Sequence, residues 1–571
     1  MRYLYLGILF FVLAYLLPIS GRPMMRPDEF RYAEIPYEMI ESGDFIVPRL
    51  LQARYFEKPV LGYWLVAASF KCFGYNRFAA RLPMALASGA TALLLALWVR
   101  REKRDSELAA FAGLSYLASG LAVALGISAV LDSILCLFTT ATVICCRMAV
   151  LTKRRDLERT LWLLLCGISA GLGFLTKGLV AWAIPGSAIL VWLLWEKRFK
   201  ALLWLPWLPL AALAVTVLPW AWAVHRADAD FWNYFIVVEH FQRFRNHADT
   251  QHPEPFWFYI PVFLGTIFPA ALAALPACGG GKALWKNVRR DPLWRFALAA
   301  FLVPFIFLSA SSGKLVTYIL PCFPFAALAM ALPALTALRE EDQPRGRSIL
   351  KWVVTLLGWL LLVAGAGCVA FGAALLPPAG LSRVLPAFGD AWGFFIVIGL
   401  AGIAGGISLI RVRRGPARSQ LKRFFAVVAA AIAPVALLPD FGSSKMPARD
   451  FRELVAAGGF DPRTAMIFTY GQMGHSVAFL LKRPDTRLII SHGEMEYGAT
   501  RAVKAKEPPL LLYRKEFTKL LKRSDRPDVV YITVSGRDIP EYITAFPHRR
   551  LRRRELELLV FPPAPAPRPK R

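Results

Sequence analysis

Apolar runs long enough to cross a lipid bilayer recur along most of this chain. A helix needs about 20 mainly apolar residues to cross the hydrocarbon core. Runs near that length begin with residues 3–19 and 83–99 and continue to 424–438. Tracts rich in Lys and Arg, such as residues 100–104, follow every second run, as the positive-inside rule expects. The pattern therefore predicts a mostly α-helical, polytopic membrane protein with about thirteen transmembrane helices.

Thirteen spans are expected within residues 1–438. They cover residues 3–19, 83–99, 107–124, 133–150, 160–175, 179–195, 202–223, 256–275, 296–309, 317–337, 352–375, 390–410 and 424–438. We interpret the first as a retained anchor, because many spans follow it. Residues 64–73 are apolar but short, which favours an interfacial or re-entrant segment.

The phase of the basic tracts places the loop 21–63 and every second later connection on the outer side of the membrane. Ionisable residues gather in these outer connections and at the span ends beside them. They are Asp28, Asp132, Lys177, His240, Arg243 and Lys314. Because ionisable residues near membrane depth are costly and usually mark a site, we expect one outward-facing polar cavity assembled from several loops.

The composition changes after Pro439. Strand-sized apolar runs at residues 465–468, 488–490 and 529–534 alternate with helix-like segments at 449–457, 473–482 and 515–522. This alternation predicts that residues 439–571 form a small α/β domain outside the membrane, followed by a disordered tail, PPAPAPRPKR.

The charge and the cysteines restrict the class of protein further. The formal net charge of +29 would suggest nucleic acid in a soluble chain. Here Lys and Arg cluster between apolar runs, so the excess reflects membrane topology, with anionic lipid as the expected neighbour. The eight cysteines all lie in or beside apolar runs, and the sequence contains no disulfide framework and no CxxC metal motif.

The outer carboxylates and cations each have a structural and a functional interpretation. Asp28 and Asp132 precede or begin helical segments, so each is either a helix cap or a carboxylate of a catalytic cavity. The outer cations either extend to lipid headgroups or hold a phosphate or pyrophosphate. These cations are Lys58, Lys177, Arg243, Arg245 and Lys314. Several such cations on one side favour a phosphorylated lipid substrate.

Aromatic residues and one acid–histidine pair complete the candidate site. Tyr32, Tyr55 and Tyr318 are either ordinary interfacial aromatics or residues that contact a sugar. Glu57 and His240 are two potential ligands for a divalent metal, although the sequence alone favours a structural hydrogen bond for His240.

Long motifs in the first 330 residues resemble a known family. They are PDEFRYAEIPYEMIESGDFIVPRLL, RYFEKPVLGYW, AVLDS, LTKG, FWNYF, VEHFQRF and SGKLVTYIL. In this order they resemble the bacterial lipid A aminoarabinose transferases, which belong to the protein O-mannosyltransferase-like group of membrane glycosyltransferases with the GT-C fold.

The resemblance implies a polyprenyl-phosphate-sugar-dependent pentosyltransferase. Such an enzyme moves 4-amino-4-deoxy-L-arabinose, with inversion, from undecaprenyl phosphate to a lipid A phosphate on the periplasmic face of the bacterial inner membrane. The product is less negative and attracts polymyxin and other cationic antimicrobial peptides less strongly. The alternatives are a related GT-C transferase for another polyprenyl-phosphate sugar or a protein acceptor, and a lipid-sugar transporter.

The resemblance also implies roles for particular residues. Asp28 and Asp132 match the cavity carboxylates. The positions that match substrate-binding roles are Glu29, Arg31, Tyr32, Tyr55, Lys58, Lys177, His240, Arg243, Lys314 and Tyr318. Among them, Lys58, Arg243 and Tyr318 suit the polyprenyl phosphate, whereas Tyr32, Tyr55 and His240 suit the sugar. Glu57 with His240 matches a divalent-metal site, with zinc as the expected ion. The enzyme is expected to act as a monomer and to have no nucleic-acid partner.

Overall fold

The computed structural model of this protein divides the chain into two compact units. It describes residues 2–152, 157–242, 252–339, 344–376, 391–438, 448–491, 495–504 and 509–563. The membrane unit comprises Met1–Arg22, Glu57–Gly62 and Arg81–Leu438, and the sheet unit comprises Pro23–Phe56, Tyr63–Ala80 and Pro439–Arg571. The expected tail after residue 563 lies outside the described residues.

The membrane unit is built from apolar helices whose lengths suit a bilayer. Among the described residues, ten helices are long and apolar enough to cross, and two pairs of bent helices bring the number to twelve. Helices that qualify include α5 (Arg77–Lys103), α8 (Asp132–Leu151), α9 (Leu157–Lys177), α12 (Trp207–Ala227, together with α11, Phe199–Trp204), α17 (Pro292–Ala310), α18 (Phe323–Arg339, together with η5, Val316–Cys322), α19 (Pro344–Ala374), α21 (Trp392–Val412) and α22 (Ala417–Ile432, together with η7, Ala433–Leu437).

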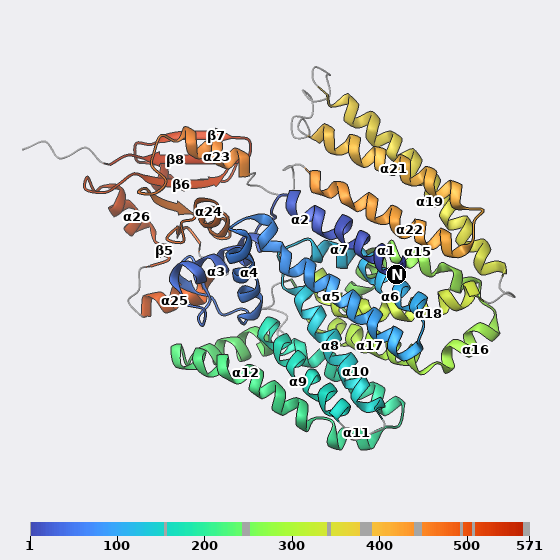
Figure 1. Ribbon diagram of the computed structural model, residues 1–571. Coiled ribbons are helices and arrows are strands. Elements are labelled where there is room, and N and C mark those ends of the chain that lie inside the picture. The colour runs from blue at the N-terminus through green and yellow to red at the C-terminus, as the bar shows by residue number, and fades with distance from the viewer. Residues whose placement is uncertain are drawn as a thin grey trace, which may run out of the picture. The chain divides into compact units, whose positions relative to one another are not determined.

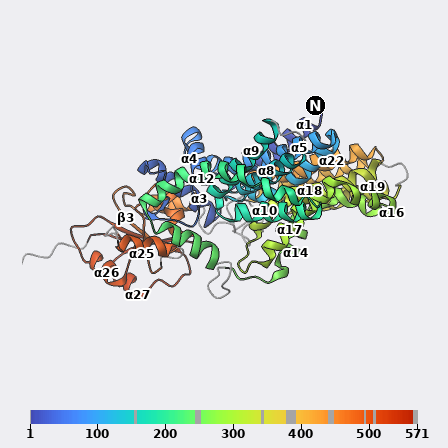
Figure 2. The ribbon, with the colours of Figure 1, turned by 90° about the horizontal axis from the view of Figure 1, so that it is seen from below.

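Every expected span has a helical counterpart. The first span is formed by α1 (Arg2–Phe11), η1 (Val12–Leu16) and α2 (Leu17–Gly21). The sixth is α10 (Val180–Trp195), an apolar helix of 16 residues that is shorter than the ten helices long enough to cross. Figure 2 shows α8, α9 and α10 side by side. The prediction of a polytopic α-helical protein is confirmed.

Two of the expected spans are broken, and their breaks contact each other. The span expected at 107–124 consists of α6 (Ser106–Leu117) and α7 (Gly120–Gly126), bent by 64°. The span expected at 256–275 bends by 77° near Pro269. The amide of Gly120 donates to the carbonyl oxygen of Phe268 over 2.9 Å. This bond satisfies backbone groups that a break would otherwise leave unpaired in an apolar environment.

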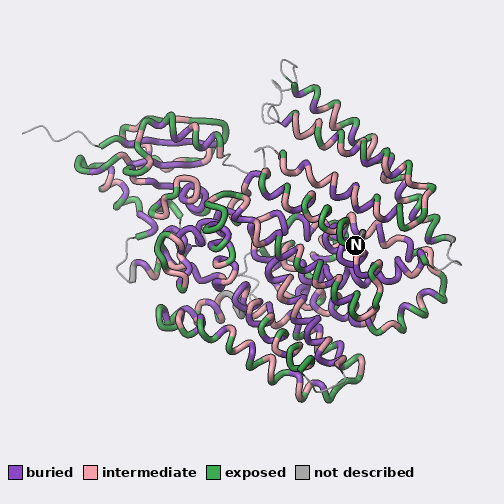
Figure 3. The backbone as a smooth tube through the Cα atoms, viewed as in Figure 1, coloured by how far each residue is buried: buried purple, intermediate pink, exposed green. Residues whose placement is uncertain are grey.

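The helices of the membrane unit differ in how much of their surface is covered by protein. In α8 and in the span Val316–Arg339, 78% and 89% of the apolar window is buried, whereas the windows of α19 and α21 are 17% and 22% buried. Figure 3 shows exposed residues along α19 and α21. Because their exposed residues are mainly apolar, these two helices face lipid, and α8 and α18 form the core of the unit.

Glycine allows α19 and α21 to pack closely. A Cβ atom at Gly365 would lie 2.6 Å from the carbonyl oxygen of Gly399, and one at Gly406 would lie 2.5 Å from that of Gly358. No larger residue fits at these positions without separating the helices. Small residues at such interfaces bring helix backbones into contact within a membrane, and the two helices lie side by side in Figure 1.

The sheet unit contains a six-stranded mixed sheet. Its strands are β3 (Met466–Thr469), β4 (Arg487–Ile489), β5 (Leu511–Leu512), β6 (Val529–Val534), β7 (Arg549–Arg553) and β8 (Leu556–Phe561), in the order β5-β4-β3-β6-β8-β7. Strands β5, β4, β3 and β6 are parallel, and β8 and β7 are antiparallel to their neighbours. The expected strands at 465–468, 488–490 and 529–534 are thus present.

Helices cover both faces of this sheet. Val530 and Ile532 of β6 pack with α23 (Ala448–Ala457) and α24 (Met473–Leu481), whereas Val529 and Tyr531 pack with α26 (Arg514–Leu521) and α27 (Glu541–Thr544). A strand buried on both faces requires a continuous apolar run, which the sequence VVYITV supplies. The expected α/β architecture is therefore observed.

Most of the first outer loop belongs to the sheet unit, except Glu57–Gly62. It contains α3 (Asp28–Ser42), the hairpin β1 (Arg49–Leu50) and β2 (Ala53–Arg54), and α4 (Leu61–Phe73). Helix α4 has 13 residues, which is too few to cross a bilayer and agrees with the expectation of a short segment. The loop that carries the main motif is thus grouped with residues 439–571.

Candidate active site

Four of the predicted site residues come together at the start of α3. Asp28 is the first residue of the helix, and its carboxylate forms an ion pair with the guanidinium of Arg31 one turn later. The Cζ atom of Arg31 lies 5.1 Å from the ring centroid of Tyr32 and 6.0 Å from that of Tyr55. A buried guanidinium beside aromatic faces is stabilised by cation–π attraction. Asp28, Arg31, Tyr32 and Tyr55 form what we call the Asp28 cluster.

Asp28 is exposed and does not cap helix α3. The residue at the cap position is Pro27, and no side chain caps the helix there. The side chain of Asp28 is 53% exposed, whereas that of Arg31 is 10% exposed. The cluster therefore presents one accessible carboxylate above a buried cation, an arrangement suited to contact with a charged or polar substrate group.

Glu29 has a structural contact beside its expected role in substrate binding, which stays a prediction. Its carboxylate accepts a hydrogen bond from the backbone amide of Met25 over 2.7 Å, and the residue is 2% exposed. This bond satisfies a backbone donor just before the helix begins, which is a structural role. Glu29 thus stabilises the segment that carries Asp28.

A histidine of the sheet unit, which no sequence motif singled out, lies near Arg31. His475 of α24 is fully buried. Burial, with the charges of Arg31 and Arg26, lowers the pKa of His475 to about 3. The imidazole is therefore neutral at physiological pH and adds no positive charge near Arg31.

A second group of predicted residues comes together in the membrane unit. Asp132 is the first residue of α8, and its Oδ1 atom lies 2.6 Å from Nζ of Lys177, the last residue of α9. The two side chains are 7% and 11% exposed. The Lys177 ammonium also lies 4.6 Å from the ring centroid of Tyr318. Asp132 thus neutralises one of the cations that we expected to bind phosphate.

Lys314 is buried and already has a partner. Its Nζ atom donates to the backbone carbonyl oxygen of Glu254 over 2.7 Å, and Lys314 is 3% exposed. Its own amide donates to the carbonyl of His252. These bonds tie the start of η5 (Val316–Cys322) to the segment before η3 (Phe256–Phe258). The expected role of Lys314 in substrate binding stays a prediction beside this structural one.

Glu57 and Lys58 follow the hairpin and belong to the membrane unit. The Lys58 ammonium donates to the backbone carbonyl of Glu57 over 2.8 Å, and the residue is half-buried. Glu57 is 8% exposed. The expected role of Lys58 in phosphate binding stays a prediction.

The remaining predicted residues lie at the edge of the described part of the chain. His240 falls within the helix η2 (Asn233–Gln242), but its side chain and all of Arg243 and Arg245 lie outside the described residues. No group of three His, Cys, Asp or Glu side chains that suits a metal occurs in the described ranges. The metal site expected from Glu57 and His240 stays a prediction.

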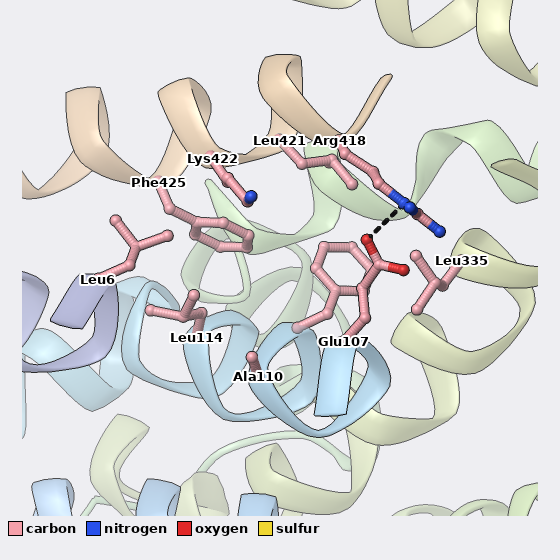
Figure 4. Close-up of a pocket in the computed structure, with 10 residues that line it drawn as sticks. Leu6, Glu107, Ala110, Leu114, Leu335, Arg418, Leu421, Lys422 and Phe425 are labelled. Atoms are coloured by element: carbon pink, nitrogen blue, oxygen red, sulfur yellow. Dashed lines mark ion pairs between the residues drawn. The ribbon is translucent and has the colours of Figure 1, made fainter. Parts of the chain in front are cut away.

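The membrane unit also contains a narrow apolar pocket that is separate from the predicted site. Figure 4 shows Leu6, Leu114 and Phe425 on its walls, with an ion pair between Arg418 and Glu107 at one side. Its volume is about 30 Å³. None of the predicted site residues lines it.

Comparison with known proteins identifies the fold. The family model described as dolichyl-phosphate-mannose-protein mannosyltransferase matches residues 1–235. The crystal structure of ArnT from Cupriavidus metallidurans bound to undecaprenyl phosphate superposes with a TM-score of 0.76, covering 98% of both chains at 22% identity. This similarity shows that the chain has the expected GT-C fold.

Curated relatives define the family. A protein of Aeromonas salmonicida named undecaprenyl phosphate-alpha-4-amino-4-deoxy-L-arabinose arabinosyl transferase is 35% identical over 500 residues, which cover 86% of each chain. A second, from Proteus mirabilis, is 42% identical over 323 residues, covering 57% of this chain and 58% of its own. The chain therefore belongs to the family of undecaprenyl phosphate-aminoarabinose arabinosyl transferases, which are multi-pass membrane glycosyltransferases.

Proposed function

We propose that this protein transfers 4-amino-4-deoxy-L-arabinose from undecaprenyl phosphate to a phosphate group of lipid A, on the periplasmic face of the bacterial inner membrane. The observation that carries the proposal is the identity of 35% with a named arabinosyl transferase over 86% of both chains. The Asp28 cluster, whose residues lie in the two motifs PDEFRYAEIPYEMIESGDFIVPRLL and RYFEKPVLGYW, supports it.

The reaction needs no proton transfer. A phosphate oxygen of the acceptor attacks the anomeric carbon of the sugar, and the bond from that carbon to the undecaprenyl phosphate oxygen breaks. The electron pair leaves with undecaprenyl phosphate, so one phosphodiester is exchanged for another. Attack from the face opposite the leaving group inverts the anomeric centre. The acceptor phosphate is already anionic near neutral pH, since the second pKa of a phosphate monoester is about 6.

This chemistry assigns Asp28 a role other than that of a general base. Its exposed carboxylate carries the charge that complements the ammonium group of the sugar, and it orients the sugar for in-line attack. Arg31 holds this carboxylate in place from the buried side. Tyr32 and Tyr55 supply aromatic faces beside Arg31 on which a pentose ring can pack.

The leaving phosphate requires cations. Lys58 and Arg243 are proposed to hold it, Lys as a point charge and Arg through paired N–H donors. Tyr318 is proposed to contribute its hydroxyl, and Lys177 with Asp132 is proposed to line the same cavity. A divalent metal held by Glu57 and His240 would supply positive charge for the departing phosphate, and no step above depends on it.

Mass spectrometry of lipid A tests the proposal. Cells that lack their own aminoarabinose transferase, with donor synthesis switched on, receive either this chain or its Asp28→Ala variant. A pentosamine-sized addition to lipid A with the intact chain alone is the expected result. No addition by an expressed and inserted wild-type protein would contradict the proposed donor or acceptor, and would favour another polyprenyl-phosphate sugar.

A further inference from the structure

A buried carboxylate from α3 holds the turn of the β1–β2 hairpin. The side chain of Glu38 accepts hydrogen bonds from two successive backbone amides, that of Leu51 over 2.5 Å at Oε1 and that of Gln52 over 2.9 Å at Oε2. Glu38 is 4% exposed. Each of the two carboxyl oxygens thus accepts one backbone N–H, so the side chain satisfies two donors of the turn at once.

The turn that Glu38 holds has an unfavourable backbone. Leu51 and Gln52 have φ angles of 54° and 65°, in the left-handed region. They join strands paired as Leu50 with Ala53, so they are the two central residues of a tight hairpin turn. Such turns normally contain Asn and Gly, because other residues pay a steric cost for positive φ. The carboxylate of Glu38 offsets that cost.

Two glycines dock the rest of the hairpin within the sheet unit. A Cβ atom at Gly474 of α24 would lie 2.7 Å from the Leu51 side chain. One at Gly498 of α25 (Glu496–Lys504) would lie 2.4 Å from the carbonyl oxygen of Arg54. The hairpin is therefore hydrogen-bonded to Glu38 at its turn and packed closely against helices α24 and α25.

This hairpin leads directly into the predicted substrate-binding residues. The amide of Tyr55 donates to the carbonyl of Pro48 over 2.8 Å, so Tyr55 continues the hairpin. Its ring lies beside Arg31 of the Asp28 cluster. Glu57 and Lys58 follow within three residues along the chain. The conformation of the Leu51–Gln52 turn thus sets where Tyr55 lies.

We infer that Glu38 is a positioning residue of the donor site: by holding the Leu51–Gln52 turn it keeps Tyr55 against Arg31, and so it supports binding of the polyprenyl-phosphate sugar. The inference rests on the proposed function. Glu38 itself is buried and acts through the hairpin, which distinguishes it from residues expected to contact the substrate.

A second acid on the same helix provides a matched control. Glu34 lies one turn before Glu38 and is fully buried, and within the described part of the chain its carboxyl oxygens have no hydrogen-bond partner. Burial, together with the nearby Glu38, raises the pKa of Glu34 well above its usual value. Glu34 is therefore protonated, and Gln is a close substitute for it. Gln is a poor substitute for Glu38, because its amide nitrogen cannot accept the second N–H.

The experiment measures donor KM and kcat of purified full-length protein in detergent, with labelled donor and lipid A. Glu38→Gln is expected to raise the donor KM about tenfold, the effect of losing one buried hydrogen bond, with kcat and the melting temperature nearly unchanged. Glu34→Gln is expected to leave KM unchanged. Adding Gln52→Gly to Glu38→Gln should restore KM, because glycine adopts positive φ without strain.

Three outcomes would overturn the inference: an unchanged KM in Glu38→Gln, an equal rise in Glu34→Gln, or no rescue by Gln52→Gly. If Glu38→Gln does not fold, Gln52→Val tests the turn from its exposed side, since a β-branched residue disfavours positive φ. That variant should raise KM, and an unchanged KM would contradict the inference.

Failure of the proposed function is recognised separately, because the wild-type protein would then transfer no aminoarabinose. Hydrogen exchange of the Leu51 and Gln52 amides gives a readout without activity. Exchange should be faster in Glu38→Gln than in the wild type and in Glu34→Gln. Equal exchange rates in all three proteins would show that the hydrogen bonds to Glu38 do not stabilise the turn.

Discussion

Lys177 and Asp132 are joined by an ion pair of 2.6 Å between the end of α9 and the start of α8, and both side chains are nearly buried. A buried charge that loses its partner is costly, typically by about 3–5 kcal/mol. Lys177→Met should therefore lower the stability of the protein strongly. The double variant Asp132→Asn/Lys177→Met, which leaves no buried charge at this position, should recover most of the lost stability.

The double variant also separates structure from chemistry at this pair. Thermal unfolding in detergent reports stability, and turnover of labelled donor reports activity. If Asp132 lines the reaction cavity as proposed, the double variant is stable but transfers little sugar. Full turnover by a stable double variant would show that Asp132 serves the fold alone.

Asp28→Asn should impair the reaction without affecting the fold. The Asp28 side chain is 53% exposed, so the lost ion pair with Arg31 contributes about 1 kcal/mol or less to stability. We expect turnover at saturating donor to fall at least tenfold, the effect of about 1.4 kcal/mol on the barrier. Glu41→Gln, at an exposed position near the end of the same helix, is the control and should retain activity. Full turnover by Asp28→Asn would contradict a role for its charge.

The membrane spans were predictable because hydrophobic length is a local property of the sequence. The bends were not, since the hydropathy of residues 107–124 does not register a break between α6 and α7. Strand β7 was missed because its sequence, RRLRR, is that of an exposed edge strand, where charges prevent further pairing.

The candidate site shows the same division. Asp28, Arg31 and Tyr32 lie within one turn of helix, so their proximity follows from sequence spacing. The pairing of Asp132 with Lys177 joins residues 45 positions apart, and His475 approaches Arg31 from the C-terminal domain. The Leu51–Gln52 turn has none of the usual Asn or Gly residues, so the sequence does not predict it. In the structure, the two backbone amides of this turn donate to the side chain of Glu38.

Zinc binding by Glu57 and His240 remains a prediction that metal analysis can test. Purified protein, washed with a weak chelator, should retain zinc as measured by plasma mass spectrometry. Glu57→Ala and His240→Ala should each lower the zinc content at least tenfold, since each removes a direct ligand. Glu158→Ala, at a surface carboxylate paired with Arg101, is the control. Equal zinc content in all four proteins would contradict the site.

The Glu34–Glu38 pair should make the folded state less stable as pH rises. Burial raises the pKa of Glu38 from 4.5 to about 8, and that of Glu34 is raised as well. Between these values the folded state keeps protons that the unfolded chain has released. Its stability is therefore fully present at low pH and falls as pH rises through this window, by up to about 1.4 kcal/mol per pH unit for each proton.

Glu34→Gln removes one of these titrations, so it should gain stability relative to the wild type as pH rises from about 5 to 8. The measurement is the difference in melting temperature between the two proteins across that range. His475 acts in the opposite direction, because its pKa of about 3 in the folded state makes stability fall below its unfolded value of 6.5. Since both proteins contain His475, its effect cancels in the difference. A difference that does not change with pH would show that Glu34 is ionised in the folded protein, against the protonated form that its burial requires.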